Sequence, residues 1–88
     1  MLDKKQKERI IEKFKTHAKD TGSPQVQIAI LTAEIKDLTG HLLEHKKDFS
    51  SRKGLMRKVS ERRRLLKYLK REDAKGFTEL TEALKIAA

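Results

Sequence analysis

The segment HLLEHKKDFSSRKGL, residues 41–55, carries side chains whose types and spacing could do chemistry. His41 and His45 are four residues apart, the spacing that places two side chains on one face of a helix. Asp48 and two serines follow them, among four cations. Such a group could bind a metal ion, activate a nucleophile, cap a helix or recognise a nucleic acid.

Metal binding and catalysis are both disfavoured by the surrounding sequence. The zincin pattern has a glutamate directly after its first histidine, whereas Leu42 follows His41 here. The chain has no cysteine, and the third histidine, His17, falls in another predicted helix. The residue types of a serine–histidine–aspartate triad are present, but a thin helical bundle offers no oxyanion hole or water-excluding pocket. We therefore expect no metal, no cofactor and no enzymatic activity.

The spacing of apolar residues predicts an all-α fold of four helices. Asp3 and Gln6 form a capping-box-like start for the first helix. Ser23 followed by Pro24 predicts the start of the second helix, which should end near Glu44.

The second and third predicted helices are long, and each carries one apolar seam. The third should run from about Ser51 to Glu72, and Asp73 can cap a short fourth helix. Two long neighbouring helices with single seams pack as an antiparallel hairpin. The residues expected to face the core are Ile10, Ile11, Phe14 and Ala18, then Ile28, Leu31, Ile35, Leu38 and Leu42, then Leu55, Val59, Leu66 and Leu69, and finally Phe77, Leu80 and Leu84.

Composition describes a small basic domain. The chain has 88 residues, of which 36% are hydrophobic, so there is room for one modest core. The 22 Lys and Arg against 13 Asp and Glu give a formal charge of +9, which favours a polyanionic partner. The start, MLDKKQKERIIEKF, has no long apolar run, so we expect neither a signal peptide nor a membrane span.

The charge is concentrated in residues 46–71, which hold 12 cations and two acids. A spacing of 100° per residue places Tyr68 among three arginines, within about 60° of one another and opposite the apolar seam. Lys67 flanks this face, and Arg62 points toward the seam as a packing residue. Cations neutralise phosphates and a ring offers stacking area, so this face suits a polynucleotide. The three arginines are Arg57, Arg64 and Arg71.

The polar group around Asp48 has two interpretations. Recognition of the shallow minor groove of A-form RNA needs acceptors for a guanine amino group and small polar groups for ribose hydroxyls. The Asp48 carboxylate, serine hydroxyls and imidazoles can supply both. Alternatively, Ser50 or Ser51 caps the third helix and Asp48 complements its dipole. The residues by themselves leave these two interpretations open.

Three ordered segments, DTGSPQVQIAILT, HLLEHKKDFSSRKGL and RRRLLKYLKRED, make essentially the whole chain resemble the bacterial small-subunit ribosomal protein fifteen family. The resemblance implies three helices in an elongated bundle around a long antiparallel hairpin, plus a mobile first helix. It also implies a single ribosomal RNA-binding domain over residues 1–88. Such a protein binds the central domain of small-subunit rRNA early in assembly. It recognises a three-way junction and, about one helical turn away, a G–U/G–C element in the minor groove.

The resemblance assigns residues to two RNA surfaces by motif. The junction surface comprises Thr21, Gly22, Gln27, Arg64, Tyr68 and Arg71. The minor-groove surface comprises His41, Asp48 and Ser51, with His45, Lys46, Lys47, Arg52 and Lys53 in support.

Further partners are implied in the same way. They are neighbouring small-subunit ribosomal proteins, large-subunit rRNA at an intersubunit bridge and, in some members, their own messenger RNA. The implied state is a cytoplasmic, ribosome-bound protein that is a monomer when free and has no membrane partner.

Two residues depart from the family pattern. Glu34 stands where relatives often have a basic residue, so the contact that such a residue would make with a phosphate is in doubt here. Ala74 replaces a common proline, so the last helix is expected to start less sharply.

Two other functions fit parts of the pattern. A helical DNA-binding or nucleoid protein would have this charge, but a helix-turn-helix needs a three- or four-residue turn between short helices. A purely structural partner-binding bundle would bind its partner with little dependence on salt.

The charge pattern predicts that RNA affinity comes mainly from phosphate neutralisation by residues 46–71. The logarithm of the association constant should then fall linearly with the logarithm of salt concentration. Arg64→Ala should flatten that slope by about one unit, the value for one phosphate contact. Titrations at four salt concentrations measure this, and an affinity independent of salt would favour the partner-binding bundle.

Overall fold

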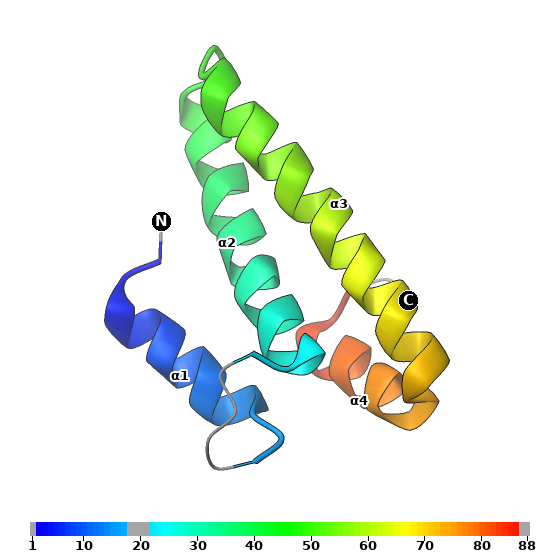
Figure 1. The fold of residues 1–88 in the computed structure, drawn as a ribbon. Helices are drawn as coiled ribbons and strands as arrows, with labels where there is room; N and C mark the ends of the chain where they lie inside the picture. Colours follow the sequence, from blue (N-terminus) through cyan, green and yellow to red (C-terminus); the bar gives the residue numbers. More distant parts are fainter. Residues whose placement is uncertain (1, 18–21, 87–88) are drawn as a thin grey trace.

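The computed structural model describes residues 2–17 and 22–86, and over these residues it contains four α-helices (Figure 1). The predicted all-α class is confirmed. The helices are α1 (Lys4–Phe14), α2 (Pro24–Glu44), α3 (Phe49–Glu72) and α4 (Ala74–Leu84).

The first two helices start where the predicted cap residues lie. The Asp3 carboxylate accepts a hydrogen bond from the Gln6 backbone N–H at 2.8 Å, and the Gln6 amide oxygen accepts one from the Asp3 N–H at 3.0 Å. The Ser23 hydroxyl accepts from the Val26 N–H at 3.3 Å, and Pro24 is the first residue of α2. These contacts satisfy backbone donors that have no partner inside the helix.

The start of α3 differs from the sequence prediction. The helix begins at Phe49, about two residues earlier than expected, and its N-cap is Asp48 rather than Ser50 or Ser51. A carboxylate accepts from the N-terminal N–H groups more strongly than a hydroxyl and also interacts favourably with the helix dipole. Asp48 therefore takes the position that we had expected a serine to fill.

The turn into α4 is sharp, because Asp73 alone separates α3 from α4. Its carboxylate accepts from the Gly76 N–H at 3.0 Å. A side-chain carbon at Gly76 would collide with this carboxylate, so glycine permits the close cap. The looser start that we expected from Ala74 is not observed.

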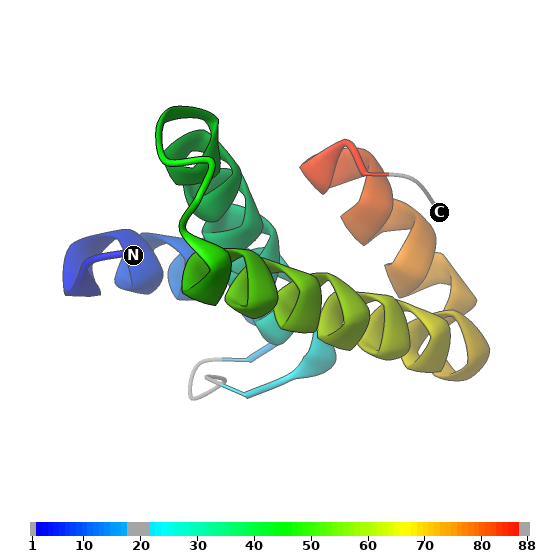
Figure 2. The ribbon, with the colours of Figure 1, turned by 90° about the horizontal axis from the view of Figure 1, so that it is seen from above.

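The helices form an elongated molecule with extents of 39 × 27 × 18 Å. Figure 1 shows α2 and α3 side by side and antiparallel, as predicted. Helix α1 packs along the N-terminal half of α2, and α4 folds back from the end of α3 to contact α2 (Figures 1 and 2). The far half of the hairpin extends beyond both short helices.

The hydrophobic core occupies the end of the molecule where all four helices meet. Of the predicted seam residues, Ile28, Leu31, Leu69, Phe77 and Leu80 are buried at this end. The seam of α1 is only partly buried, as are residues toward the hairpin turn such as Leu42 and Leu55. Ala18 lies outside the described residues. The cause is geometric, because two helices cannot enclose a side chain as four can. The buried hydrophobic residues are Val26, Ile28, Ala29, Leu31, Leu69, Phe77 and Leu80.

Two polar contacts join α2 to α3 between the core and the hairpin turn. Glu34 is 8% exposed, and its carboxylate lies 3.3 Å from the Lys58 ammonium. Arg62, predicted to point toward the seam, donates to the Thr32 hydroxyl at 3.3 Å. Glu34 thus faces a cation of α3, and this contact gives the acid a structural role.

We predict that Lys58→Met destabilises the protein by about 1–3 kcal/mol, because it leaves the Glu34 carboxylate almost buried and without a counter-charge. For a domain of this size, each kcal/mol lowers Tm by about 4–8 °C in thermal denaturation. The double variant Glu34→Leu/Lys58→Met should recover most of the loss, since an apolar pair replaces the ion pair. Lys53→Met makes the same change at an exposed site on α3 and should stay within about 0.5 kcal/mol of the parent.

Candidate nucleic-acid interface

The structure brings His41, Asp48 and Ser51 together at the hairpin turn, although they come from three successive segments. One oxygen of the Asp48 carboxylate lies 2.7 Å from Nε2 of His41 and 2.6 Å from the Ser51 hydroxyl, which donates to it. The other oxygen accepts from the Ser51 backbone N–H at 3.0 Å. A single carboxylate therefore ties the end of α2 to the start of α3. We call these three residues the Asp48 cluster.

The backbone of residues 45–48 holds Asp48 in place. The His45 N–H donates to the His41 carbonyl at 2.9 Å and ends α2, and the Asp48 N–H donates to the His45 carbonyl at 3.1 Å. The Arg52 guanidinium reaches back across the turn and donates to the Lys46 carbonyl at 2.7 Å. The turn is thus closed by hydrogen bonds from both sides.

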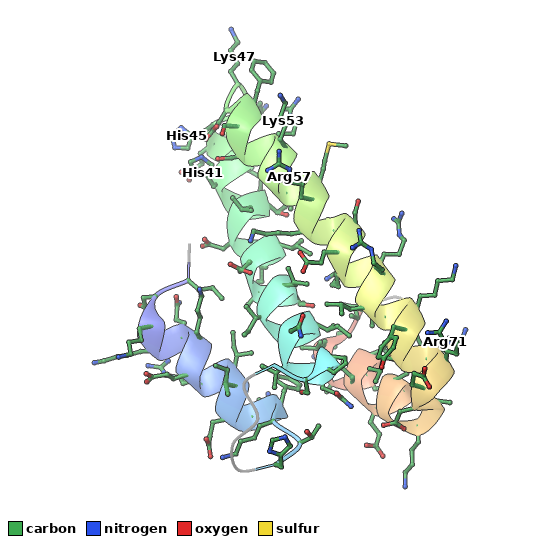
Figure 3. All side chains as sticks on the ribbon, in the orientation of Figure 1. His41, His45, Lys47, Lys53, Arg57 and Arg71 are labelled. Carbon is green, nitrogen blue, oxygen red and sulfur yellow. The ribbon has the colours of Figure 1, made fainter. Side chains whose placement is uncertain are left out.

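His45 supports the Asp48 cluster through its ring. The His41 and His45 rings stack with their centroids 4.6 Å apart and their planes 29° from parallel. Figure 3 shows both imidazoles on the same side of the hairpin end. The predicted sharing of one helix face is therefore observed, with the rings packed against each other.

The pKa of the Asp48 carboxyl is held well below its ordinary range. The largest cause is the hydrogen bond from the Ser51 hydroxyl, followed by the Ser51 backbone N–H and then His41. Asp48 is therefore an anion throughout the physiological pH range. Because an ionised carboxylate can accept about four hydrogen bonds and the Asp48 cluster uses three, one acceptor position remains.

The Asp48 cluster is accessible from solvent. The His41 side chain is 41% exposed and that of Asp48 33%. Beside them lies a surface depression of about 590 Å³. It is lined by Lys36, Asp37, Leu38, Gly40, His41, Glu44 and Ser51.

Cations surround the Asp48 cluster at the end of the hairpin. Lys46, Lys47, Arg52 and Lys53 are all exposed there, and Figure 3 shows Lys47 at the tip and Lys53 on α3. Within residues 2–17 and 22–86, no group of three or more histidine or acidic side chains is placed to hold a metal ion. The arrangement here is an anionic acceptor inside a cationic rim.

The second predicted surface lies toward the other end of α3. Arg64, Tyr68 and Arg71 are exposed, and the Arg71 guanidinium lies 5.6 Å from the centroid of the Tyr68 ring. Figure 3 shows Arg57 and Arg71 along this helix. The Tyr68 ring, 46% exposed, offers both a face and a hydroxyl to a ligand.

The remaining junction residues lie at the start of α2, which the antiparallel pairing brings to the same end of the molecule as Tyr68. The Gln27 side-chain amide donates to the Gly22 carbonyl and so fixes the backbone that enters α2. Thr21 lies outside the described residues.

Comparison with known proteins gives the family. A profile of the family described as ribosomal protein S15 matches residues 6–87. The chain belongs to the ribosomal protein S15 family.

Three relatives in this family are each named small ribosomal subunit protein uS15. The chain is 58% identical to that of Heliobacterium modesticaldum, 55% to that of Carboxydothermus hydrogenoformans and 52% to that of Limosilactobacillus fermentum. Each match spans 83 residues, covering 94% of this chain and 93% of the relative.

Sequence analysis of this ribosomal protein S15 family member did not single out three exposed apolar side chains on the outer half of the hairpin. Leu43, Phe49 and Met56 are each more than 60% exposed. The sequence could have shown this, because none of the three falls on the apolar seam of its helix.

In the described part of the chain, no helix is both long enough and apolar enough to cross a membrane.

The lowered pKa of Asp48 predicts how stability depends on pH. Because the folded-state pKa lies below the unfolded value near 4, the charge stabilises the fold above that value. This contribution should be lost as the pH falls below about 4 toward the folded-state pKa.

The measurement is denaturant unfolding of the parent and of Asp48→Asn, which keeps a good N-cap residue without a charge. The difference in unfolding free energy should be largest near pH 6 and should shrink toward pH 2. A difference that does not change with pH would contradict a role for the ionised carboxylate.

Proposed function

We propose that this chain is a structural, non-enzymatic protein of the small ribosomal subunit that binds the central domain of the subunit's rRNA through two surfaces. Residues 1–88 act as a single RNA-binding domain. The observation that carries the proposal is the Asp48 cluster, an ionised acceptor fixed by His41 and Ser51 inside a cationic hairpin end. Membership of the S15 family supports the ribosomal setting.

The Asp48 cluster suits a G–U/G–C element in an RNA minor groove. Phosphates repel a carboxylate, so one kept at this surface needs a donor as its partner, and the guanine amino group is the donor that the minor groove displays. The Ser51 hydroxyl and the imidazole of His41 can bond the 2′-hydroxyls beside that base. The N-cap and recognition roles are compatible, since the cap leaves one acceptor position.

The second surface suits a three-way junction. Arg64 and Arg71 neutralise phosphates, and Tyr68 supplies a ring that can stack where bases are splayed from a helix. Gly22 and Gln27, at the start of α2, join this surface from the other side. We include Thr21 on the strength of its motif alone.

The length of α3 separates the two RNA features. Ser51 and Tyr68 are 17 residues apart on one continuous helix, a rise of about 25 Å. The α2–α3 hairpin acts as a spacer, so it selects RNA in which the junction and the G–U/G–C element are correctly separated.

Further partners follow from the same setting. Neighbouring small-subunit proteins and large-subunit rRNA at an intersubunit bridge are proposed partners, as is the chain's own messenger RNA. The proposed location is the cytoplasmic ribosome, and the free protein is a monomer.

The DNA-binding alternative fits the structure less well. Helices of 21 and 24 residues pack antiparallel here, whereas a helix-turn-helix sets two short helices at a large angle. Competition between a folded RNA junction and duplex DNA at equal salt tests this. Stronger binding to DNA would overturn the proposal.

The two-surface arrangement predicts separable effects of Asp48→Ser and Tyr68→Ala. Serine keeps the N-cap but removes the charged acceptor, so Asp48→Ser should weaken binding to intact RNA by roughly ten- to a hundredfold. The loss of a negative charge near phosphates offsets part of this effect. On RNA whose G–U/G–C pairs are replaced, Asp48→Ser should have little effect, whereas Tyr68→Ala should weaken binding to both RNAs.

Binding constants for both single variants and the double variant, on both RNAs, complete the test. Sites this far apart should contribute additively. If Asp48→Ser weakens binding equally to both RNAs, Asp48 is only a helix cap and the minor-groove assignment fails.

A further inference from the structure

Helix α3 carries a second row of cations that the two proposed RNA surfaces do not include. Arg63, Lys67 and Lys70 follow one another at intervals of four and three residues, which places them on one face over a rise of about 10 Å. At 100° per residue, this face points about 100° away from the one that carries Arg64 and Tyr68. Lys67, which flanks the first face as the sequence predicted, also lines this second one.

These three cations border a groove of about 440 Å³ between α3 and α4. The groove has an apolar floor formed by Val59, Leu66 and Phe77. The Lys70 ammonium lies 5.6 Å from the centroid of the Phe77 ring, which holds this cation at the α4 side.

The positive charge of the groove is not neutralised within the described part of the chain. Arg63, Lys67 and Lys70 form no ion pair there, whereas Lys58 on the same helix is paired with Glu34. The remaining lining residue, Arg62, donates to the Thr32 hydroxyl. Every side chain that lines the groove is therefore either apolar or a cation.

We propose that the α3–α4 groove binds an unpaired nucleotide of a second, single-stranded RNA segment. This inference rests on the proposed RNA-binding function. The row of cations contacts successive phosphates, and the base enters the groove against Val59 and Leu66. A duplex could use the cations but not the apolar floor, because its bases are stacked inside the helix. A single strand uses both.

The lining also determines which bases fit. Its polar groups are all hydrogen-bond donors, so a base edge rich in acceptors is favoured. Uracil presents a carbonyl where cytosine presents an amino donor. The groove should therefore bind oligouridylate more tightly than oligocytidylate.

The experiment uses the full chain saturated with a three-way junction RNA that carries the G–U/G–C element. Fluorescence anisotropy then follows addition of a labelled ten-nucleotide oligouridylate at four salt concentrations. The test variant is Arg63→Gln/Lys67→Gln/Lys70→Gln. The control, Lys4→Gln/Lys5→Gln/Arg9→Gln, makes the same charge change at exposed positions of α1.

For the groove variant, the slope of affinity against salt on logarithmic axes should flatten by about two units, from three contacts at about 0.7 each. The affinity itself should fall at least tenfold at low salt, while the α1 control stays within about twofold of the parent. Equal effects of the two triple variants would overturn the proposal, since they would show only general attraction to a basic protein.

Two further measurements separate the alternatives. Equal affinity for oligouridylate and oligocytidylate would overturn the entry of a base into the groove. If the groove variant instead binds oligouridylate normally and loses binding to a helical peptide of glutamate and leucine, the groove is a protein-docking surface and the proposal fails.

Controls keep this result distinct from the proposed function. Junction RNA alone is titrated against each protein, and failure of the parent to bind it would overturn the two-surface function only. The oligonucleotide titration, repeated without junction RNA, still tests the groove. Thermal melting checks the fold of each variant. If the triple variant does not fold, the comparison is repeated with single changes, with Lys67→Glu as the groove variant and Lys5→Glu as the α1 control.

Discussion

The antiparallel pairing of α2 and α3 is the interaction on which the rest of the structure depends. Its two helices supply five of the seven buried hydrophobic residues in the described part of the chain, fix the distance between the two ends of the hairpin, and bring α1 and α4 to one end. Most of the chain's cations lie on α3 and the turn before it and repel one another there, whereas α2 carries three acids against one lysine, so the pairing brings opposite charges together. Glu34 offsets one of these cations near the middle of the helix pair, where apolar burial is already thinner.

Apolar burial and polar contacts therefore stabilise different halves of the molecule. Where four helices meet, Ile28, Leu69 and Phe77 form a closed core. At the far end only two helices meet, and polar contacts of Asp48 replace apolar burial. The same contacts fix the geometry of the acceptor that we propose for the minor groove, so a ligand there finds a site that is already ordered. Preorganisation of this kind reduces the entropy lost on binding.

The distribution of charge around α3 explains how one helix could contact more than one RNA segment. Its inner side packs on α2, and Lys58 on that side is neutralised by Glu34. The outer face carries Tyr68 with its arginines, and the flank toward α4 carries the unpaired row that begins at Arg63. A single RNA helix can contact only part of these basic residues, because the cations of α3 point in different directions.

The sequence by itself determined the helices and most of their ends, because caps and apolar spacing act over three or four residues. Asp3, Ser23 and Asp73 were predicted as caps, and each one caps its helix. The antiparallel hairpin also followed from local patterns, since each long helix has a single seam. The choice of cap for α3 did not follow from local patterns, because Asp48, Ser50 and Ser51 are all suitable cap residues. Only the competing contacts of the folded turn decide between them. The joining of His41 to Asp48, the pairing of Glu34 with Lys58 and the groove beside Phe77 were decided by the tertiary structure alone. Each depends on the distance between side chains of different helices, which no spacing within one helix specifies.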